Sequence, residues 1–242
     1  MIKYRTPHPS AKGMSFPKNK LNVVIRHGAS KKAIQENVRF KYEINNIEAI
    51  SNNANKHKMK ELLVGAGVST TDSFENTTEN RELFKKNGWN VVFKLRNHRR
   101  GIGMEFLPVA EIDRLDGKEG LIERRINVKR EWRVHACPLL NKTYALEKRR
   151  RNDAEGPARN IENCVFREME NAPAPPDSWN DALNLCMDAV KAIGLDTGAV
   201  DLAWSGKNYY VIEVNSGPGL GEKSKAWYQS VYTDLITEKT KE

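Results

Sequence analysis

The segment GLDTGAVDLAWSGKNYYVIEVNSGPGL, residues 194–220, constrains this chain more than any other part of it. Two apolar runs flank the turn signal Ser205-Gly206-Lys207-Asn208, a pattern typical of a β-hairpin. Asp201 interrupts the first run, and Glu213 interrupts the second. A loop of three residues, 206–208, puts the two carboxylates opposite each other, whereas a loop of two or four residues puts them on opposite faces.

Asn215 shares a face with Glu213, because side chains alternate along a strand. With the three-residue loop, two carboxylates and an amide oxygen point to one spot, which suits Mg²⁺ held together with phosphates. Acidic residues on a hairpin usually form its solvated face. Here they interrupt apolar runs, where a charge is costly unless it is paired or ligated. Spacing alone leaves both interpretations open.

Composition indicates a soluble globular protein of one large or two small domains, with 242 residues, 39% of them hydrophobic and 29% charged. No apolar stretch approaches the ~18–20 residues of a membrane span. The basic N-terminus lacks the apolar region of a secretory signal. Cys137, Cys164 and Cys186 have no metal-type spacing, and a cytoplasmic location without disulfides is expected.

The formal net charge of +9 favours an anionic partner, which could be nucleic acid, a nucleotide or an acidic peptide. Most dense clusters of basic residues lie in Arg96–Arg100, Arg124–Arg133 and Lys148–Arg151. None of them carries the interleaved aromatic residues of a single-strand binding surface. A solvated basic face explains these runs equally well.

Apolar periodicity and turn residues predict an α+β fold. Strands are expected over 21–28, 90–95, the end of 96–107, 120–126, 131–139 and 142–150, followed by the hairpin. Helices are expected from the cap Asn55 to about Gly65, near 78–87, over 179–193 behind a Ser178–Asp181 capping box, and over 222–238. The segment 47–52 is a short helix or strand, and residues 1–20 and 151–163 are expected to be irregular.

Lys94 lies inside the apolar strand NVVFKL. It is either an edge-strand residue whose amine reaches water or a phosphate contact. The turn that follows contains Gly101 and Gly103, and glycines let backbone N–H groups close over phosphate oxygens. A hairpin turn explains these glycines equally well. Together, the lysine, the glycine loop and the acidic hairpin supply the cation, cradle and metal that a nucleoside triphosphate needs.

Arg133 shares a strand face with Glu131, so the two could form a structural ion pair. Alternatively, its planar guanidinium could stabilise a phosphorylated or carboxylate-bearing intermediate.

These segments, in this order, resemble the ATP-grasp ligases. They are similar to RimK-like carboxylate–amine ligases, and most similar to compact ATP-grasp proteins of bacteriophages. The resemblance covers roughly residues 45–225, and its most specific parts are EWRVH and GAVDL with EVNSGPGL. The matching segments are NNIEAISNNANKHKMKELLVGAGVST (45–70), VVFKLRNHRRGIGM (91–104), LIERRINVKREWRVHA (121–136), ALEKRRR with ARNIEN (145–163), and AIGLDTGAVDLAW with YYVIEVNSGPGL (192–220).

The resemblance implies a nucleotide site. Two lysines would contact the phosphates, a glycine loop would close over them, and a glutamate at a hinge would hold the adenine and ribose. In this sequence these are Lys56, or Lys58 in the alternative register, with Lys94, Gly101, Gly103 and Glu123.

It also implies a reaction centre. Arg133 would face an acyl phosphate, and one or two Mg²⁺ ions, with Mn²⁺ as the alternative, would be held by three hairpin residues. Asn215 would take part in catalysis as well. The metal-binding residues are Asp201, Glu213 and Asn215, and the substrate end of the cleft would contain Asn160 with Arg149 or Arg159.

The implied fold has two α+β subdomains that clasp ATP: a small one over 51–120 and a large one over 121–242. Residues 1–50 would be a reduced form of the pre-grasp domain, which is usually fuller in the family. The glycine loop is short and unusually basic, and Ser216 follows the hairpin asparagine, where Thr or Ala is usual.

The implied activity is ATP- and Mg²⁺-dependent ligation of a small-molecule or peptide carboxylate to an amine. The enzyme would act in the cytoplasm, that of a host cell if the protein is viral, and without a membrane partner. Two alternatives remain open. One is a protein that binds or modifies nucleic acid on the same scaffold, and the other is a small-molecule kinase.

Overall fold

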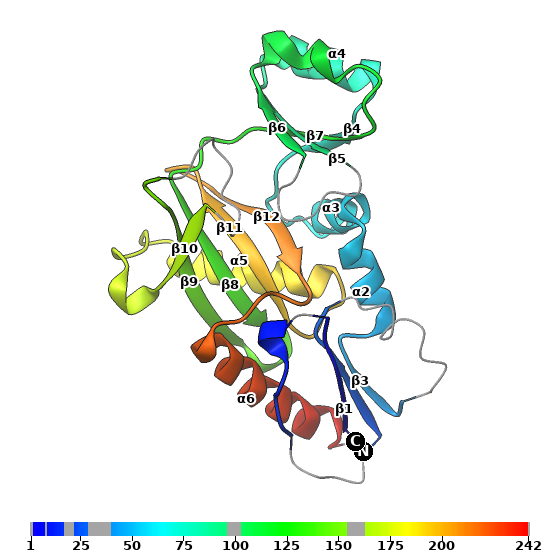
Figure 1. Cartoon of the computed structure of the whole chain (residues 1–242), viewed down its shortest axis with the longest axis vertical. Helices are drawn as coiled ribbons and strands as arrows, with labels where there is room; N and C mark the ends of the chain where they lie inside the picture. The colour runs from blue at the N-terminus through cyan, green and yellow to red at the C-terminus, as the bar shows by residue number, and fades with distance from the viewer. Residues whose placement is uncertain are drawn as a thin grey trace.

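The computed structural model describes residues 2–7, 9–16, 22–28, 40–95, 103–153 and 163–241. Three sheets follow one another along its long axis (Figure 1). The parallel N-terminal sheet has the order β1 (Ile2–Arg5), β2 (Val23–Arg26), β3 (Tyr42–Ile44). The large antiparallel sheet has the order β10 (Cys164–Glu168), β9 (Lys142–Arg150), β8 (Arg130–Cys137), β11 (Gly198–Trp204), β12 (Tyr209–Asn215). The small antiparallel sheet has the order β4 (Ser73–Glu75), β7 (Gly120–Arg124), β5 (Val91–Leu95), β6 (Met104–Leu107).

The small sheet carries helix α4 (Thr78–Asn87) on one face, at the top of Figure 1. The Thr77 hydroxyl caps this helix by accepting a hydrogen bond from the Asn80 amide at 3.2 Å, and Gly88 ends it with φ of 65°. Phe84, Phe93 and their neighbours form a separate core beneath α4. The sequence-based prediction of this helix is confirmed.

The large sheet packs one face on α5 (Trp179–Ala192), with α2 (Ile47–Ala54) and α3 (Lys56–Gly65) completing the same core. Asn55 caps α3 as predicted, since its side chain accepts from the Lys58 amide at 3.1 Å. The predicted Ser178–Asp181 capping box is wrong, because Ser178 makes no side-chain cap bond. Helix α5 forms nonetheless, since Ala182, Cys186 and further apolar residues on one face are buried.

Two differences from the sequence-based predictions concern the chain before residue 73. Residues 2–5, expected to be irregular, form β1, which pairs in parallel with the fully buried β2. The cause is tertiary pairing, which a local pattern does not show. Helix α3, which lies within the small subdomain predicted over 51–120, packs through Met59 and Leu63 on the core of the large sheet. Helix α2, which crosses the predicted boundary after residue 50, packs there through Ile50.

Helix α6 (Glu222–Lys239) lies against the N-terminal sheet, and Tyr228, Tyr232 and Leu235 are buried between them (Figure 1). None of the helices in the described ranges combines the length and apolar character that a membrane span requires.

The hairpin of β11 and β12 forms as predicted, but its loop is not the three-residue loop that would face the two carboxylates by itself. Its loop has four residues, since Trp204 pairs with Tyr209. A four-residue loop alone would put Asp201 and Glu213 on opposite faces. A β-bulge restores the register: Leu202 pairs with Val211 but Asp201 pairs with Glu213, so Ile212 is the extra residue.

Gly217 should be intolerant of a side chain. An added Cβ would lie 2.4 Å from the Cα of Gly28 and 2.8 Å from the carbonyl carbon of His27. We expect Gly217→Ala to lower the free energy of unfolding by about 1–3 kcal/mol, because the contacted atoms are backbone. Gly65→Ala is the control, since it meets nothing within 4 Å among the described atoms. Urea unfolding of the two variants should separate them; equal stability would contradict the close packing.

Candidate active site

Asp201 and Glu213 face each other across β11 and β12, on the side of the sheet away from α5. Their neighbours Val200 and Val214 point the other way, into the core. The Asp201 side chain is 7% exposed and that of Glu213 is 30% exposed. Asn215 shares this face and donates a hydrogen bond from Nδ2 to Glu213 Oε1 at 3.0 Å.

Asp201 is bound by cations from two neighbouring strands. Arg133 of β8 donates from Nε to Oδ1 at 2.8 Å and from Nη2 to Oδ2 at 3.0 Å. Lys148 of β9 lies 3.5 Å from Oδ2 and also contacts Glu131. Strand register puts Arg133 directly opposite Asp201, which accepts both of these hydrogen bonds, while Glu131 contacts Lys148.

These cations keep both carboxyl groups ionised. Burial acts to raise the pKa of Asp201, but Arg133 and Lys148 outweigh burial and hold that pKa below its ordinary value. Partial burial likewise acts to raise the pKa of Glu213, and Lys56 with the Asn215 hydrogen bond lowers it. Metal ligands must be deprotonated, so both groups are in the state that a cation binds.

The donor set fits Mg²⁺. Two carboxylates and one amide supply hard oxygen atoms, and Mg²⁺ commonly takes one or two protein carboxylates and completes its shell with water and phosphate. Within the described part of the chain, no group of three or more His, Cys, Asp or Glu could enclose a metal. An ion at Asp201 and Glu213 would therefore share its coordination with a bound phosphate.

Of the two alternative lysines on α3, the structure brings only Lys56 to this face. Its Nζ lies 3.3 Å from Glu213 Oε2. Lys58 is exposed and pairs with Glu61 at 3.3 Å.

Lys94 and Glu123 lie together on the small sheet, where Lys94 Nζ is 2.8 Å from Glu123 Oε2. The same oxygen accepts from the Thr71 hydroxyl at 2.9 Å, and Lys60 Nζ lies 3.8 Å away. Burial acts to raise the pKa of Glu123, but Lys60 and Lys94 hold it at about 2. Burial lowers the pKa of Lys60 to about 8. Glu123 thus holds Lys94 in place in this structure.

A cavity of about 390 Å³ opens beside Arg133. The guanidinium of Arg133 lies over the Phe166 ring, 4.9 Å from its centroid. Tyr144 donates its hydroxyl to Glu168, at 2.8 and 2.7 Å from the two carboxylate oxygens. The lining residues are Arg133, His135, Tyr144, Leu146, Phe166, Glu168, Gly219, Gly221, Glu222, Lys223 and Ser224.

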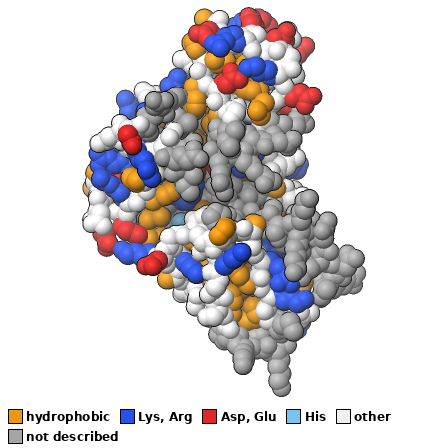
Figure 2. All heavy atoms as spheres, viewed as in Figure 1, with side chains coloured by type: hydrophobic (Ala, Val, Ile, Leu, Met, Phe, Trp, Pro, Cys, Tyr) orange, Lys and Arg blue, Asp and Glu red, His pale blue; other side chains and the backbone are white. Residues whose placement is uncertain are grey.

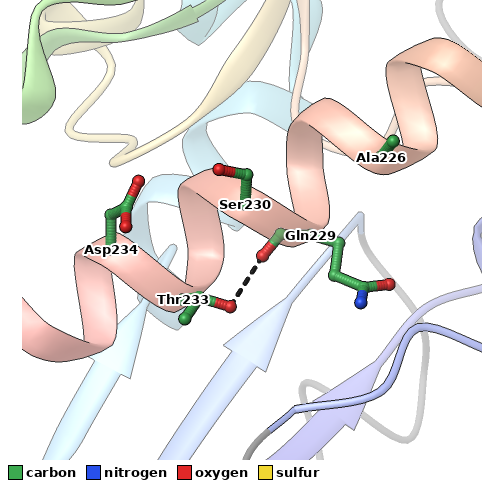
Figure 3. A pocket seen from close by; sticks show the side chains of 5 residues that line it. All are labelled: Ala226, Gln229, Ser230, Thr233 and Asp234. Atoms are coloured by element: carbon green, nitrogen blue, oxygen red, sulfur yellow. Dashed lines mark hydrogen bonds between the residues drawn. The ribbon is translucent and has the colours of Figure 1, made fainter.

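A second cavity, of about 400 Å³, runs along α6 and is lined by Ala226, Gln229, Ser230, Thr233 and Asp234. Figure 3 shows that these side chains point in different directions along the helix. Asp234 pairs with Lys142 at 2.7 Å, and Thr233 donates to the Gln229 carbonyl at 2.9 Å. No reaction centre is indicated here by the described side chains.

Two further predicted residues that the structure describes, Gly103 and Arg149, do not lie with the acidic pair. Gly103 is exposed at the turn into β6, with φ of 77°, which the hairpin interpretation explains. Arg149 is exposed and follows Lys148 on β9, so alternation puts it on the opposite face from Asp201. Figure 2 shows Lys and Arg side chains gathered over this β9–β10 edge. Three predicted residues lie outside the described ranges: Gly101, Arg159 and Asn160.

Sequence reasoning missed Lys60, Thr71 and Lys148. Lys60 follows Lys56 by four residues and therefore lies near its face of the helix, a usable signal. Lys148 belongs to a basic run for which a solvated face and an anionic partner both stayed open. Its spacing of two residues from Leu146, which pairs with Arg133, puts it on the face of Arg133.

No family model matches the sequence, and no curated protein does. Solved structures do match. D-alanine–D-alanine ligase from Bacillus anthracis, complexed with ATP, is 17% identical over 91% of this chain and 81% of its own, with a TM-score of 0.64. N5-carboxyaminoimidazole synthetase from Staphylococcus aureus is 16% identical, over 81% and 54%, with a TM-score of 0.61. The ATP-grasp ligase PsnB, complexed with a minimal precursor, Mg and ADP, is 17% identical, over 84% and 72%, with a TM-score of 0.60.

This chain has the ATP-grasp fold. The predicted α+β class and ATP-grasp architecture are confirmed. In this ATP-grasp chain, the small sheet carries Lys94 and the large sheet carries the acidic hairpin.

Lys148→Met should destabilise the fold strongly. The change removes the cation that contacts the buried Glu131, and removing one partner of a buried ion pair costs about 3–5 kcal/mol. Arg149→Met, one residue away but exposed, should change the free energy of unfolding by less than about 0.5 kcal/mol. Urea unfolding at neutral pH measures both, and similar losses would contradict the assignment of Lys148 to the buried face.

Glu123 should make stability depend on pH below about 4.3, its ordinary unfolded value. Because its folded pKa is about 2, its contribution is complete above that value and is lost as the pH falls toward 2. Between pH 5 and pH 2.5, wild type should lose roughly 2–3 kcal/mol more than Glu123→Gln. Glu61→Gln, at an exposed site, should follow wild type. Parallel urea-unfolding profiles for wild type and Glu123→Gln would refute the ion cluster.

Proposed function

We propose that this protein is an ATP- and Mg²⁺-dependent ligase that activates a carboxylate as an acyl phosphate and joins it to an amine. The observation that carries the proposal is the Asp201–Glu213 pair, held ionised beside Lys56 on a fold shared with ligases. Two similar structures support it, since one is a D-alanine–D-alanine ligase complexed with ATP and another is PsnB complexed with Mg and ADP.

Lys56 and Lys94 would bind the nucleotide phosphates, because both are lysines that already face carboxylates at this site. Asp201, Glu213 and Asn215 would hold Mg²⁺, which offsets the negative charge of phosphate oxygens when bound. Glu123, at 4% exposed and ion-paired, would orient Lys94 rather than contact the adenine and ribose through its side chain.

The reaction has two displacements. A carboxylate oxygen attacks the γ-phosphorus of ATP, the bond to the β-phosphate oxygen breaks, and ADP leaves. The amine nitrogen then attacks the acyl carbon, loses a proton to solvent, and displaces inorganic phosphate. The protein contributes positioning and charge neutralisation. Arg133 would act on the acyl phosphate, since Asp201 binds one edge of its guanidinium and the group also lines the cavity.

The cavity beside Arg133 would take the amine substrate. Glu168, fixed by the Tyr144 hydroxyl, supplies a carboxylate, and Phe166 and Tyr144 supply aromatic faces, both of which attract an ammonium group. Assignment to the RimK-like subgroup and to a bacteriophage stays a prediction from the sequence resemblance.

The matched pair Lys56→Ala and Lys58→Ala tests the phosphate contact. Lys56→Ala should weaken ATP affinity about tenfold or more, because a hydrogen bond to a charged group contributes about 1.5–3 kcal/mol. Lys58→Ala removes an equal charge from the exposed side of the same helix and should stay within about twofold of wild type. Calorimetric titration with ATP and Mg²⁺ measures both affinities. Equal losses of affinity would mean that Lys56 acts only through its positive charge and not through a phosphate contact.

Product analysis decides the reaction class. Purified protein with ATP, Mg²⁺ and pooled acids and amines should release ADP and inorganic phosphate and form an amide. A stable phosphoester would identify a kinase instead. The absence of any ATP binding by wild type would remove the ligase proposal.

A further inference from the structure

Lys60 is a buried cation that the proposed reaction does not use. It lies on α3 at 5% exposed, and its Nζ donates to the hydroxyls of Thr70 and Thr71, at 2.8 and 2.7 Å. Burying a lysine amine is costly, so a lysine in this position requires a compensating role.

One oxygen of Glu123 joins Lys60 to Lys94. Lys94 Nζ lies 2.8 Å from Oε2 of Glu123, the Thr71 hydroxyl donates to the same oxygen at 2.9 Å, and Lys60 Nζ lies 3.8 Å from it. Lys60 therefore reaches Glu123 both directly and through Thr71.

Charge counting shows what Lys60 adds. Glu123 and Lys94 alone form a neutral pair, and an ammonium neutralised by a buried carboxylate attracts phosphate weakly. With Lys60, the cluster of two lysines and one carboxylate carries one net positive charge.

The cluster also spans two sheets. Lys60 is anchored on the large sheet, since its neighbours Met59 and Leu63 lie in that core and Thr70 donates to the Val211 carbonyl of β12 at 2.6 Å. Lys94 and Glu123 belong to β5 and β7 of the small sheet. Lys60 is therefore held on the large sheet, and it brings its positive charge beside Glu123 and Lys94 of the small sheet.

We infer that Lys60 is a positioning residue that neutralises Glu123 and so keeps the charge of Lys94 available to nucleotide phosphates. This inference rests on the proposed binding of ATP. It assigns Lys60 no contact with the nucleotide, because its amine is held by two threonine hydroxyls.

A double-mutant cycle tests the inference, with ATP and Mg²⁺ titrated calorimetrically into each variant. Lys60→Met should weaken ATP affinity about tenfold or more, because Glu123 then neutralises Lys94. In a Glu123→Gln background there is no carboxylate to neutralise, so adding Lys60→Met should change affinity by less than about threefold. Lys58→Met, an exposed change on the same helix, is the control and should match wild type.

A purely structural Lys60 predicts a different pattern, in which its loss weakens ATP binding equally in both backgrounds. That result, or an unchanged affinity of Lys60→Met, would overturn the inference while leaving ATP binding by wild type intact. Urea unfolding identifies variants that fail to fold. If Lys60→Met alone is unfolded, a loss of more than about threefold on adding it to Glu123→Gln overturns the inference. Wild type that binds no ATP would remove both this inference and the proposed function.

Discussion

The acidic face of the large sheet depends on the paired hydrogen bonds between Arg133 and Asp201. Burying a carboxylate costs several kcal/mol unless cations and hydrogen bonds compensate for the lost water. Arg133 supplies two hydrogen bonds in a planar fork, and Lys148 adds a second cation. This compensation lets Asp201 stay ionised at 7% side-chain exposure, beside the more open Glu213.

That compensation operates only because the strands are in one register. Asp201 has Arg133 on one side and Glu213 on the other, and a shift of one residue would put Asp201 into the core beside Val200 and Leu202. The bulge at Ile212 therefore determines the geometry of this face, because it corrects the offset that the four-residue loop introduces. A bulge that re-aims side chains next to a site is a common device in antiparallel sheets.

Local features could be predicted from the sequence, but the pairing of strands and of side chains from distant parts of the chain could not. The helix capped by Asn55 and the existence of the β11–β12 hairpin follow from residues close in the chain. The local pattern did not predict the bulge at Ile212, on which the facing of Asp201 and Glu213 depends. The shared strand face left a pair of Arg133 with Glu131 open, but the hydrogen bonds of Arg133 go to Asp201, which cross-strand register puts opposite it. β1 was missed because its pairing with the buried β2, not its own pattern, places it in the sheet.

The two antiparallel sheets differ in how their buried charges are compensated. On the large sheet, Arg133 and Lys148 face two carboxylates, Asp201 and Glu131, so the buried charges balance. On the small sheet, two lysines share the single carboxylate of Glu123, which leaves one positive charge. A bound triphosphate would be attracted by this excess positive charge, because its phosphates are anionic. The excess charge exists because Lys60 adds a second cation to the pair of Lys94 and Glu123.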